Sequence, residues 1–285
     1  MNTPVLDLHS HSFFSDGSLS PEELVKRAHE KGVNILALTD HDETKGLNAA
    51  RTKAKSLGMC LINGVEVSVS WNKKTIHIVG LGIDPENQAL QQGLSYIRDE
   101  RIKRGKKIAE KLEKCGIQNV WQEITDKVGF EAVTRTHFAQ FLVEQGHAKD
   151  MQQAFKRWLA RKGRAYVNGH WIGLEECVKL INDAGGQAVI AHPVRYKMTN
   201  AKLEELVKTF KEYGGVGIEV VASRYSAQER AYVASIARRF DLLASVGSDF
   251  HFPGNPYIDL GYNLDLPIET SAIWQTWPEY LELVE

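Results

Sequence analysis

The sequence lacks several features that would assign it to a special class of protein. No apolar run approaches the roughly 20 residues that a membrane-spanning helix needs. The opening residues, MNTPVLDLHSHS, contain no basic segment followed by an apolar one, so we expect no secretory signal and a cytoplasmic location. The three cysteines, Cys60, Cys115 and Cys177, are too few and too widely spaced for a disulfide framework or a thiolate zinc site. Neither a membrane nor an obligatory protein partner is expected.

What is present is an ordinary globular composition with an uneven distribution of charge. The 285 residues are 43% hydrophobic and 25% charged, which suits one large domain or two smaller ones. Between Arg98 and His170 there are 16 Lys/Arg against 9 Asp/Glu, a balance of +7, and the remainder carries −8. An acidic body could bind metal cations while a basic segment binds an anionic substrate. Solvation of helix faces is the alternative explanation of the basic residues.

Short apolar runs separated by helical patterns predict an α/β fold. The predicted strands are Val5–His9, Ile35–Thr39, Cys60–Val65, Thr75–Leu81, Ala188–Ala191, Gly217–Val221 and Leu242–Val246. Ser20 to Glu23 combine an N-cap, a proline and a capping-box glutamate, which predicts a helix through about Glu30. Similar patterns cover Leu174–Ala184 and Leu203–Tyr213. Seven strands alternating with helices indicate a parallel sheet, most simply a barrel.

The basic stretch interrupts this alternation. It contains helical patterns at Ile97–Cys115, Thr136–Gln145 and Met151–Lys162 and no convincing strand. We therefore predict a barrel formed by residues 1–97 and 171–285, with residues 98–170 inserted as a helical cap over one end of it.

Histidines and carboxylates gather in or after the predicted strands. The six histidines of this kind are His9, His11, His41, His77, His192 and His251. The three carboxylates are Asp16, Glu66 and Asp249. Side chains at the C-terminal ends of barrel strands converge on one face, where active sites of such barrels lie. We therefore expect these nine side chains to meet.

Nine nitrogen and oxygen donors exceed what one cation needs, so the pattern predicts two or three divalent ions. Imidazoles and carboxylates without thiolates are compatible with Mn²⁺, Fe²⁺ or Zn²⁺. Ions held in this way activate water and neutralise charge at phosphorus, which points to phosphoester hydrolysis. The neighbouring Asp7, Asp40 and Asp42 either orient the histidines or cap turns.

The complete set of motifs resembles the polymerase-and-histidinol-phosphatase (PHP) superfamily. The matching motifs are Asp7-Leu8-His9-Ser10-His11, Thr39-Asp40-His41-Asp42, Gly64-Val65-Glu66, His77, Ala191-His192-Pro193 and Gly247-Ser248-Asp249-Phe250-His251. The resemblance implies a distorted seven-stranded (β/α)7 TIM-like barrel with a trinuclear metal site. Residues 134–139 and 184–193 look like the branch that contains ribonuclease AM and 3′,5′-nucleoside bisphosphate phosphatases.

The resemblance also implies which residues hold which ion. The first ion would be held by His9, His11, Glu66 and Asp249. A second ion, bridged by Glu66, would be held also by His77 and His192. The third would be held by Asp16, His41 and His251. Of the three metals left open by the ligand types, we expect Mn²⁺.

Two related hydrolase activities follow from the resemblance. One is a 5′→3′ exoribonuclease that releases 5′-mononucleotides from 5′-phosphorylated RNA, including ribosomal RNA precursors, and from short oligonucleotides. The other is a phosphatase that removes the 3′-phosphate of 3′,5′-bisphosphonucleosides. In both, Arg135 and His137 of the cap would bind the 5′-phosphate of the substrate. Glu66, Asp249, His192 and His251 would form the catalytic centre, and either histidine or a water would protonate the leaving 3′-oxygen.

Three residues that follow predicted strands are further candidates for the nucleotide pocket: Arg195, Tyr196 and Arg224. Two other functions stay open. A phosphatase of a small metabolite such as histidinol phosphate is disfavoured by the long basic insertion. A non-enzymatic metal-binding module is disfavoured by the complete ligand set.

Overall fold

The computed structural model describes residues 4–255 and 257–284, which belong to two compact units. One unit comprises the described residues up to Leu94 and from Ile172 onward, and the other comprises Ser95–Trp171. No helix among the described residues is long and apolar enough to cross a membrane.

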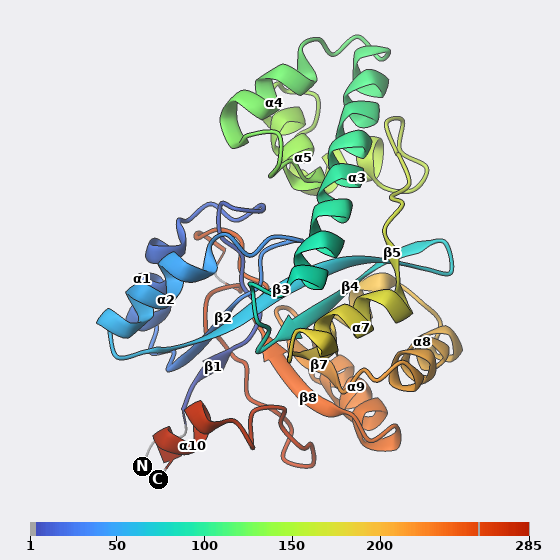
Figure 1. The fold of residues 1–285 in the computed structure, drawn as a ribbon. Coiled ribbons are helices and arrows are strands. Elements are labelled where there is room, and N and C mark those ends of the chain that lie inside the picture. Colours follow the sequence, from blue (N-terminus) through green and yellow to red (C-terminus); the bar gives the residue numbers. More distant parts are fainter. Residues whose placement is uncertain (1–3, 256, 285) are drawn as a thin grey trace. The chain divides into compact units, whose positions relative to one another are not determined.

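The first unit is built on a nearly closed barrel of seven strands (Figure 1). In spatial order these are β1 (Leu6–Asp7), β2 (Ile35–Leu38), β3 (Cys60–Trp71), β4 (Lys74–Leu81), β6 (Gln187–Ile190), β7 (Gly217–Ala222) and β8 (Leu243–Gly247). The first and last strands meet where Leu8 N donates to Val246 O (3.1 Å) and Asp249 N donates to His9 O (2.8 Å). The short β5 (Ile172–Gly173) pairs with β3. The predicted seven-stranded α/β barrel is therefore confirmed.

The expectation of a purely parallel sheet is wrong at β4, which runs antiparallel to both β3 and β6. Only Asn72 and Lys73 connect β3 to β4, and a parallel connection needs a dozen or more residues. Both residues have positive φ, +45° and +60°, as two-residue hairpin turns require. The hairpin also extends β3 to Trp71, beyond the predicted end at Val65, so that Glu66 lies inside a strand.

Helices surround this barrel (Figure 1). They are α1 (Pro21–Glu30), α2 (Leu47–Ser56), α7 (Leu174–Asp183), α8 (Asn200–Glu212) and α9 (Ala227–Arg239), with a short helix η2 (Pro193–Tyr196) after β6 and α10 (Pro278–Val284) near the C-terminus. At α1 the predicted capping box is present, because the Ser20 hydroxyl accepts from Glu23 N and the Glu23 carboxylate accepts from Ser20 N. Helices α2, α9 and α10 were not predicted.

The second unit is helical and has its own hydrophobic core. It contains most of α3 (Gln88–Glu113), then α4 (Val120–Val128), α5 (Arg135–Glu144), α6 (Met151–Ala154) and the π-helix η1 (Phe155–Leu159). Helix α3 begins nine residues before the predicted start. The single helix predicted at Met151–Lys162 is instead a short α-helix that continues as a π-helix and ends at Leu159.

Barrel closure depends on the close approach of Gly247 to His9. A Cβ at Gly247 would lie 2.3 Å from His9 Cβ and 3.0 Å from His9 N. We expect Gly247→Ala to lower the free energy of unfolding by about 1–3 kcal/mol, because neither backbone can move without displacing a strand. Urea unfolding measures this, with Gly173→Ala as the control, since a Cβ there meets nothing within 4 Å. Equal destabilisation by the two variants would contradict the close-packing explanation.

Candidate metal centre

Eight of the nine predicted side chains lie together in the first unit and form three overlapping groups that could hold metal ions. The first group is His9, His11, Glu66 and Asp249. The second is His11, Asp16, His41 and His251. The third is His41, Glu66 and His77. Within each group the candidate ligand atoms lie within 4.8 Å of one another. His192 joins the cluster through Glu66, whose Oε1 lies 2.9 Å from His192 Nε2.

Glu66 stands at the middle of the cluster and is fully buried. Its Oε1 lies 2.8 Å from His77 Nδ1, and its Oε2 lies 2.9 Å from His41 Nδ1 and 3.3 Å from His9 Nε2. Oε2 accepts no hydrogen bond despite these nearby nitrogens. A buried carboxylate with each oxygen facing a different set of imidazoles could serve as a common ligand of two cations.

The backbone at two of these positions is strained. His192 (φ +29°) and Asp249 (φ +51°) are non-glycine residues with positive φ. Such conformations cost of order 1–3 kcal/mol and persist where the surroundings enforce them, as at binding sites. Here the loops are joined by backbone pairing of Ser10 with Phe250 and of His41 with Glu66. The fold therefore fixes the directions of the ligands.

Buried aspartates hold the loops that carry the histidines. Asp40 accepts hydrogen bonds from the Ser12 backbone and from the hydroxyls of Ser12 and Ser15 (2.6–2.7 Å). Asp42 accepts from the backbone and hydroxyl of Ser68. Asp7 accepts from the backbone nitrogens of Ser248, Gly261 and His9. These contacts are with turns and serines, so they favour the turn-capping alternative for all three aspartates.

Glu219 was not predicted, and it contacts two of the ligand residues directly. It is buried on β7, with Oε1 2.6 Å from His9 Nδ1, and Oε2 accepts from the backbone nitrogen of His192. A carboxylate on Nδ1 holds the proton there, so a cation at Nε2 of His9 would displace only the proton on that second nitrogen. The only signal in the sequence is one acidic residue in the apolar run Gly217–Ala222.

The electrostatics of the cluster favour cations. Burial opposes ionisation of Glu66 and Asp249, but imidazoles and, at Asp249, the Arg195 guanidinium outweigh it and hold the pKa of both carboxyls well below their usual range. Burial likewise opposes protonation of His9, yet the carboxylates of Glu219, Glu66 and Asp249 raise its pKa well above the ordinary value. The carboxylates therefore stay ionised and attract positive charge into the buried site.

The pKa values of two other histidines, His11 and His251, are shifted in opposite directions. Burial and the neighbouring His251 lower the pKa of His11 to about 3, which keeps its lone pair available to a metal. The pKa of His251 rises to about 10 because Asp16 and Asp249 outweigh the effect of its burial. Imidazole and carboxylate donors without a thiolate fit Mn²⁺, Fe²⁺ or Zn²⁺. The residues present thus fit a multinuclear metal site.

The three predicted pocket residues of the first unit differ in their surroundings. The Arg195 guanidinium pairs with Asp249, and that carboxylate raises its pKa despite burial. The Tyr196 hydroxyl donates to Ala191 O (2.8 Å) and accepts from His77 N (2.8 Å), so it ties together the strands that carry two ligands. Arg224 is exposed in the turn after β7, with φ +67°.

Arg135 and His137 lie in the second unit, in the first turn of α5. His137 Nδ1 accepts from Thr134 N (3.1 Å). Nearby are two arginines that were not singled out from the sequence, Arg101 and Arg104, whose guanidinium carbons lie 5.3 and 5.5 Å from the centre of the Trp171 ring. Burial, with the positive charges of Arg135 and Arg101, holds the pKa of Arg104 well below its usual range. This concentration of positive charge suits an anion.

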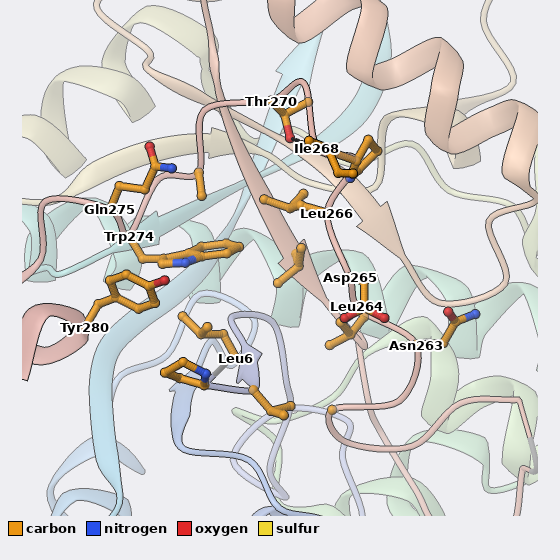
Figure 2. Close-up of a pocket in the computed structure, with 16 residues that line it drawn as sticks. Leu6, Asn263, Leu264, Asp265, Leu266, Ile268, Thr270, Trp274, Gln275 and Tyr280 are labelled. Atoms are coloured by element: carbon orange, nitrogen blue, oxygen red, sulfur yellow. Dashed lines mark hydrogen bonds between the residues drawn. The ribbon is translucent and has the colours of Figure 1, made fainter. Parts of the chain in front are cut away.

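A separate cavity of about 540 Å³ lies between β1, β8 and the C-terminal segment (Figure 2). Leu6, Trp274 and Tyr280 line it together with polar residues such as Asp265. None of the nine candidate ligands lines it. We assign it no catalytic role.

Comparisons with known proteins show which family this sequence and fold match. The PHP domain family matches residues 7–223. The "5'-3' exoribonuclease Rnm" of Salmonella typhimurium is 44% identical, over 96% of this chain and 94% of its own. The "3',5'-nucleoside bisphosphate phosphatase" of Chromobacterium violaceum is also 44% identical, over 95% of each chain. A solved amidohydrolase structure from Chromobacterium violaceum, with sulfate bound, superimposes with a TM-score of 0.90 at 44% identity, covering 95% of this chain and 94% of that one. Matched by this domain over most of its length and by relatives over nearly all of it, the chain belongs to the PHP family.

Proposed function

We propose that the protein is a metal-dependent phosphoesterase that acts at the 3′-phosphate of 5′-phosphorylated nucleotides. On RNA it acts as a 5′→3′ exoribonuclease that releases 5′-mononucleotides, and on 3′,5′-bisphosphonucleosides it removes the 3′-phosphate. The observation that carries this proposal is the cluster of six imidazoles and three carboxylates around Glu66. The names of the relatives from Salmonella typhimurium and Chromobacterium violaceum support both activities.

We assign the ligands to three ions. The first is held by His9, His11, Glu66 and Asp249, as in the most buried group. The second is held by Glu66, His77 and His192, whose ring nitrogens face Glu66 Oε1. The third is held by Asp16, His41 and His251. When bound, these ions supply an activated water and neutralise charge on the phosphoryl oxygens. We propose Mn²⁺ as the ion.

The protein's own residues position the substrate and the metal ligands. Arg195 sits beside the ligand Asp249, where its guanidinium can bind an oxygen of the attacked phosphate. Glu219 and Tyr196 hold the strands that carry the ligands, and we keep Tyr196 as a residue that lines the nucleotide pocket. The proton for the leaving 3′-oxygen would come from His192, His251 or a water; as metal ligands the two histidines are poor acids, which favours the water.

The arginines of the second unit supply recognition of the 5′-phosphate. Burial, and then the positive charges of Arg135 and Arg101, lower the pKa of Arg104, and a phosphate dianion bound among the three arginines would offset that positive charge. Guanidinium groups bind phosphate in a bidentate manner, which makes them suited to terminal phosphates. We propose that residues 98–170 form a cap that binds the 5′-phosphate of the substrate through Arg135 and His137. Arg224 of the first unit would line the nucleotide pocket.

Arg135→Ala is expected to reduce the preference for a 5′-phosphate over a 5′-hydroxyl at least tenfold, because a charge-assisted bond of about 1.5–3 kcal/mol is lost. The measurement is kcat/KM on matched RNAs with each 5′ end. Metal content should stay at the wild-type level. Arg157→Ala, an exposed arginine of the same unit whose guanidinium lies over Trp158, is the control. An unchanged preference in Arg135→Ala would refute the assignment.

The function itself is tested by a time course with Mn²⁺ on a short 5′-phosphorylated RNA. Successive release of 5′-mononucleotides from the 5′ end establishes the exonuclease. If the RNA stays intact while 3′,5′-bisphosphoadenosine yields AMP and phosphate, the protein is a nucleotide phosphatase only. Turnover of histidinol phosphate with neither nucleotide substrate cleaved would favour the metabolite phosphatase, and no turnover at all with metal bound would favour a metal-binding module.

By the same reasoning we propose a cytoplasmic role in trimming RNA 5′ ends, ribosomal RNA precursors included. The exoribonuclease names of the bacterial relatives support this role. Deletion of the gene should leave ribosomal RNA with extended 5′ ends, which primer extension measures.

A further inference from the structure

Two half-exposed phenylalanines lie close in sequence to ligands of a partly exposed metal-binding group, that of His11, Asp16, His41 and His251. Phe13 is 48% exposed and Phe252 is 43% exposed. Phe13 follows the ligand His11 by two residues, and Phe252 directly follows His251. Single exposed apolar side chains are common on protein surfaces and need no function. Here, however, two aromatic rings occur on two separate loops, each beside a ligand of the same group.

The loops that carry the two rings are held together. Ser18 N donates to His251 O (2.8 Å), and Phe13 N donates to Leu19 O (2.9 Å). The carboxylate of Asp16 in the first loop lies 3.2 Å from His251 Nε2 in the second. Phe13 also packs against Phe14, with ring centres 4.8 Å apart. The rings are therefore presented by backbone that is already fixed, which lowers the entropy cost of binding to them.

The group beside the two rings is partly exposed at His41 and His251, whereas the group formed by His9, His11, Glu66 and Asp249 is entirely buried. An RNA substrate continues beyond the attacked phosphate, and that continuation has to leave the buried centre across an exposed edge. Bases stack on aromatic side chains with little dependence on sequence, because every base has a π-face. An exposed phenyl ring beside the metal ligands is suited to such a base.

We propose that Phe13 and Phe252 form a stacking platform for the base on the 3′ side of the attacked phosphate in RNA. This inference rests on the proposed exoribonuclease function. The platform would contact RNA but not a 3′,5′-bisphosphonucleoside, because the latter has no base beyond its 3′-phosphate. The platform thus favours RNA over single nucleotides at one and the same metal centre.

The test compares KM for a 5′-phosphorylated tetranucleotide with KM for 3′,5′-bisphosphoadenosine in Phe13→Ala and Phe252→Ala. The ratio of the two KM values should rise at least about fivefold for each ring removed, because that ring no longer stacks on the base. Phe13→Tyr and Phe252→Tyr retain a ring and should keep the wild-type ratio. Tyr213→Ala removes an exposed ring after α8 and is the control. An unchanged ratio in both alanine variants overturns the proposal.

A second readout keeps this test distinct from that of the proposed function. A tetranucleotide with 2-aminopurine as its second base and a non-hydrolysable first linkage is titrated to saturation, with binding followed by anisotropy of a dye at its 3′ end. Stacking should quench the 2-aminopurine fluorescence in wild type, and the alanine variants should lose that quenching. Wild-type protein that hydrolyses neither substrate contradicts the proposed function, while quenching still decides the platform. Equal quenching in wild type and the double alanine variant overturns it.

Discussion

Glu66→Gln is expected to lower phosphoester hydrolysis by about a hundredfold to a thousandfold. Among the carboxylates that the structure describes, Glu66 is the one whose two oxygens face different imidazoles, His77 and His192 on one side and His41 and His9 on the other. A glutamine keeps the volume but removes the negative charge and replaces one acceptor oxygen with a donor. Two ions would therefore lose their common ligand.

Metal content and thermal unfolding measure this loss independently of activity. A ligand that binds only the folded protein raises its stability as the ligand concentration rises, so the wild-type midpoint should increase with added Mn²⁺. The Glu66→Gln midpoint should increase far less. Glu205→Gln, which removes an exposed carboxylate on α8, should behave like wild type. Full metal content together with full activity in Glu66→Gln would contradict the bridging position.

The convergence of the candidate ligands could be predicted because successive strands of a barrel end at a shared face. Four candidate ligands directly follow β1, β2, β6 and β8: His9, His41, His192 and Asp249. The strand positions alone therefore predict that these side chains converge. His77 and Glu66 reach the same place by a different route, since both lie inside the β3–β4 hairpin. An apolar run looks the same whichever way the strand points, and therefore the antiparallel direction of β4 was missed.

Residues that act through other residues were harder to find. Glu219 is one acidic side chain in an apolar strand, and only its contacts with His9 and His192 show why it is buried there. Arg101 and Arg104 are two of many basic residues in a helix, and spacing alone does not separate a buried guanidinium from a solvated one. The change from α-helix to π-helix at Phe155 could not be predicted from the spacing of apolar residues, because these residues continue a helical pattern.

Glu219→Gln is expected to weaken metal binding about 10- to 100-fold, the usual effect of removing the partner of a metal-ligating histidine. The two oxygens of Glu219 face two donors, His9 Nδ1 and the backbone nitrogen of His192. Glutamine offers one acceptor and one donor, so one of these contacts becomes donor against donor. Either His9 or the strained backbone at His192 must then shift.

Because Glu219 positions ligands and does not touch the reacting atoms, excess metal should restore much of the lost activity. The measurement is the Mn²⁺ concentration that gives half-maximal activity, with the activity at saturating Mn²⁺ as a second value. We expect the half-maximal Mn²⁺ concentration to rise 10- to 100-fold, while the activity at saturating Mn²⁺ stays within about threefold of wild type. Glu229→Gln, in the capping box of α9, is the control for loss of a carboxylate on the same unit. A loss of activity that Mn²⁺ does not restore would instead place Glu219 in the chemical step.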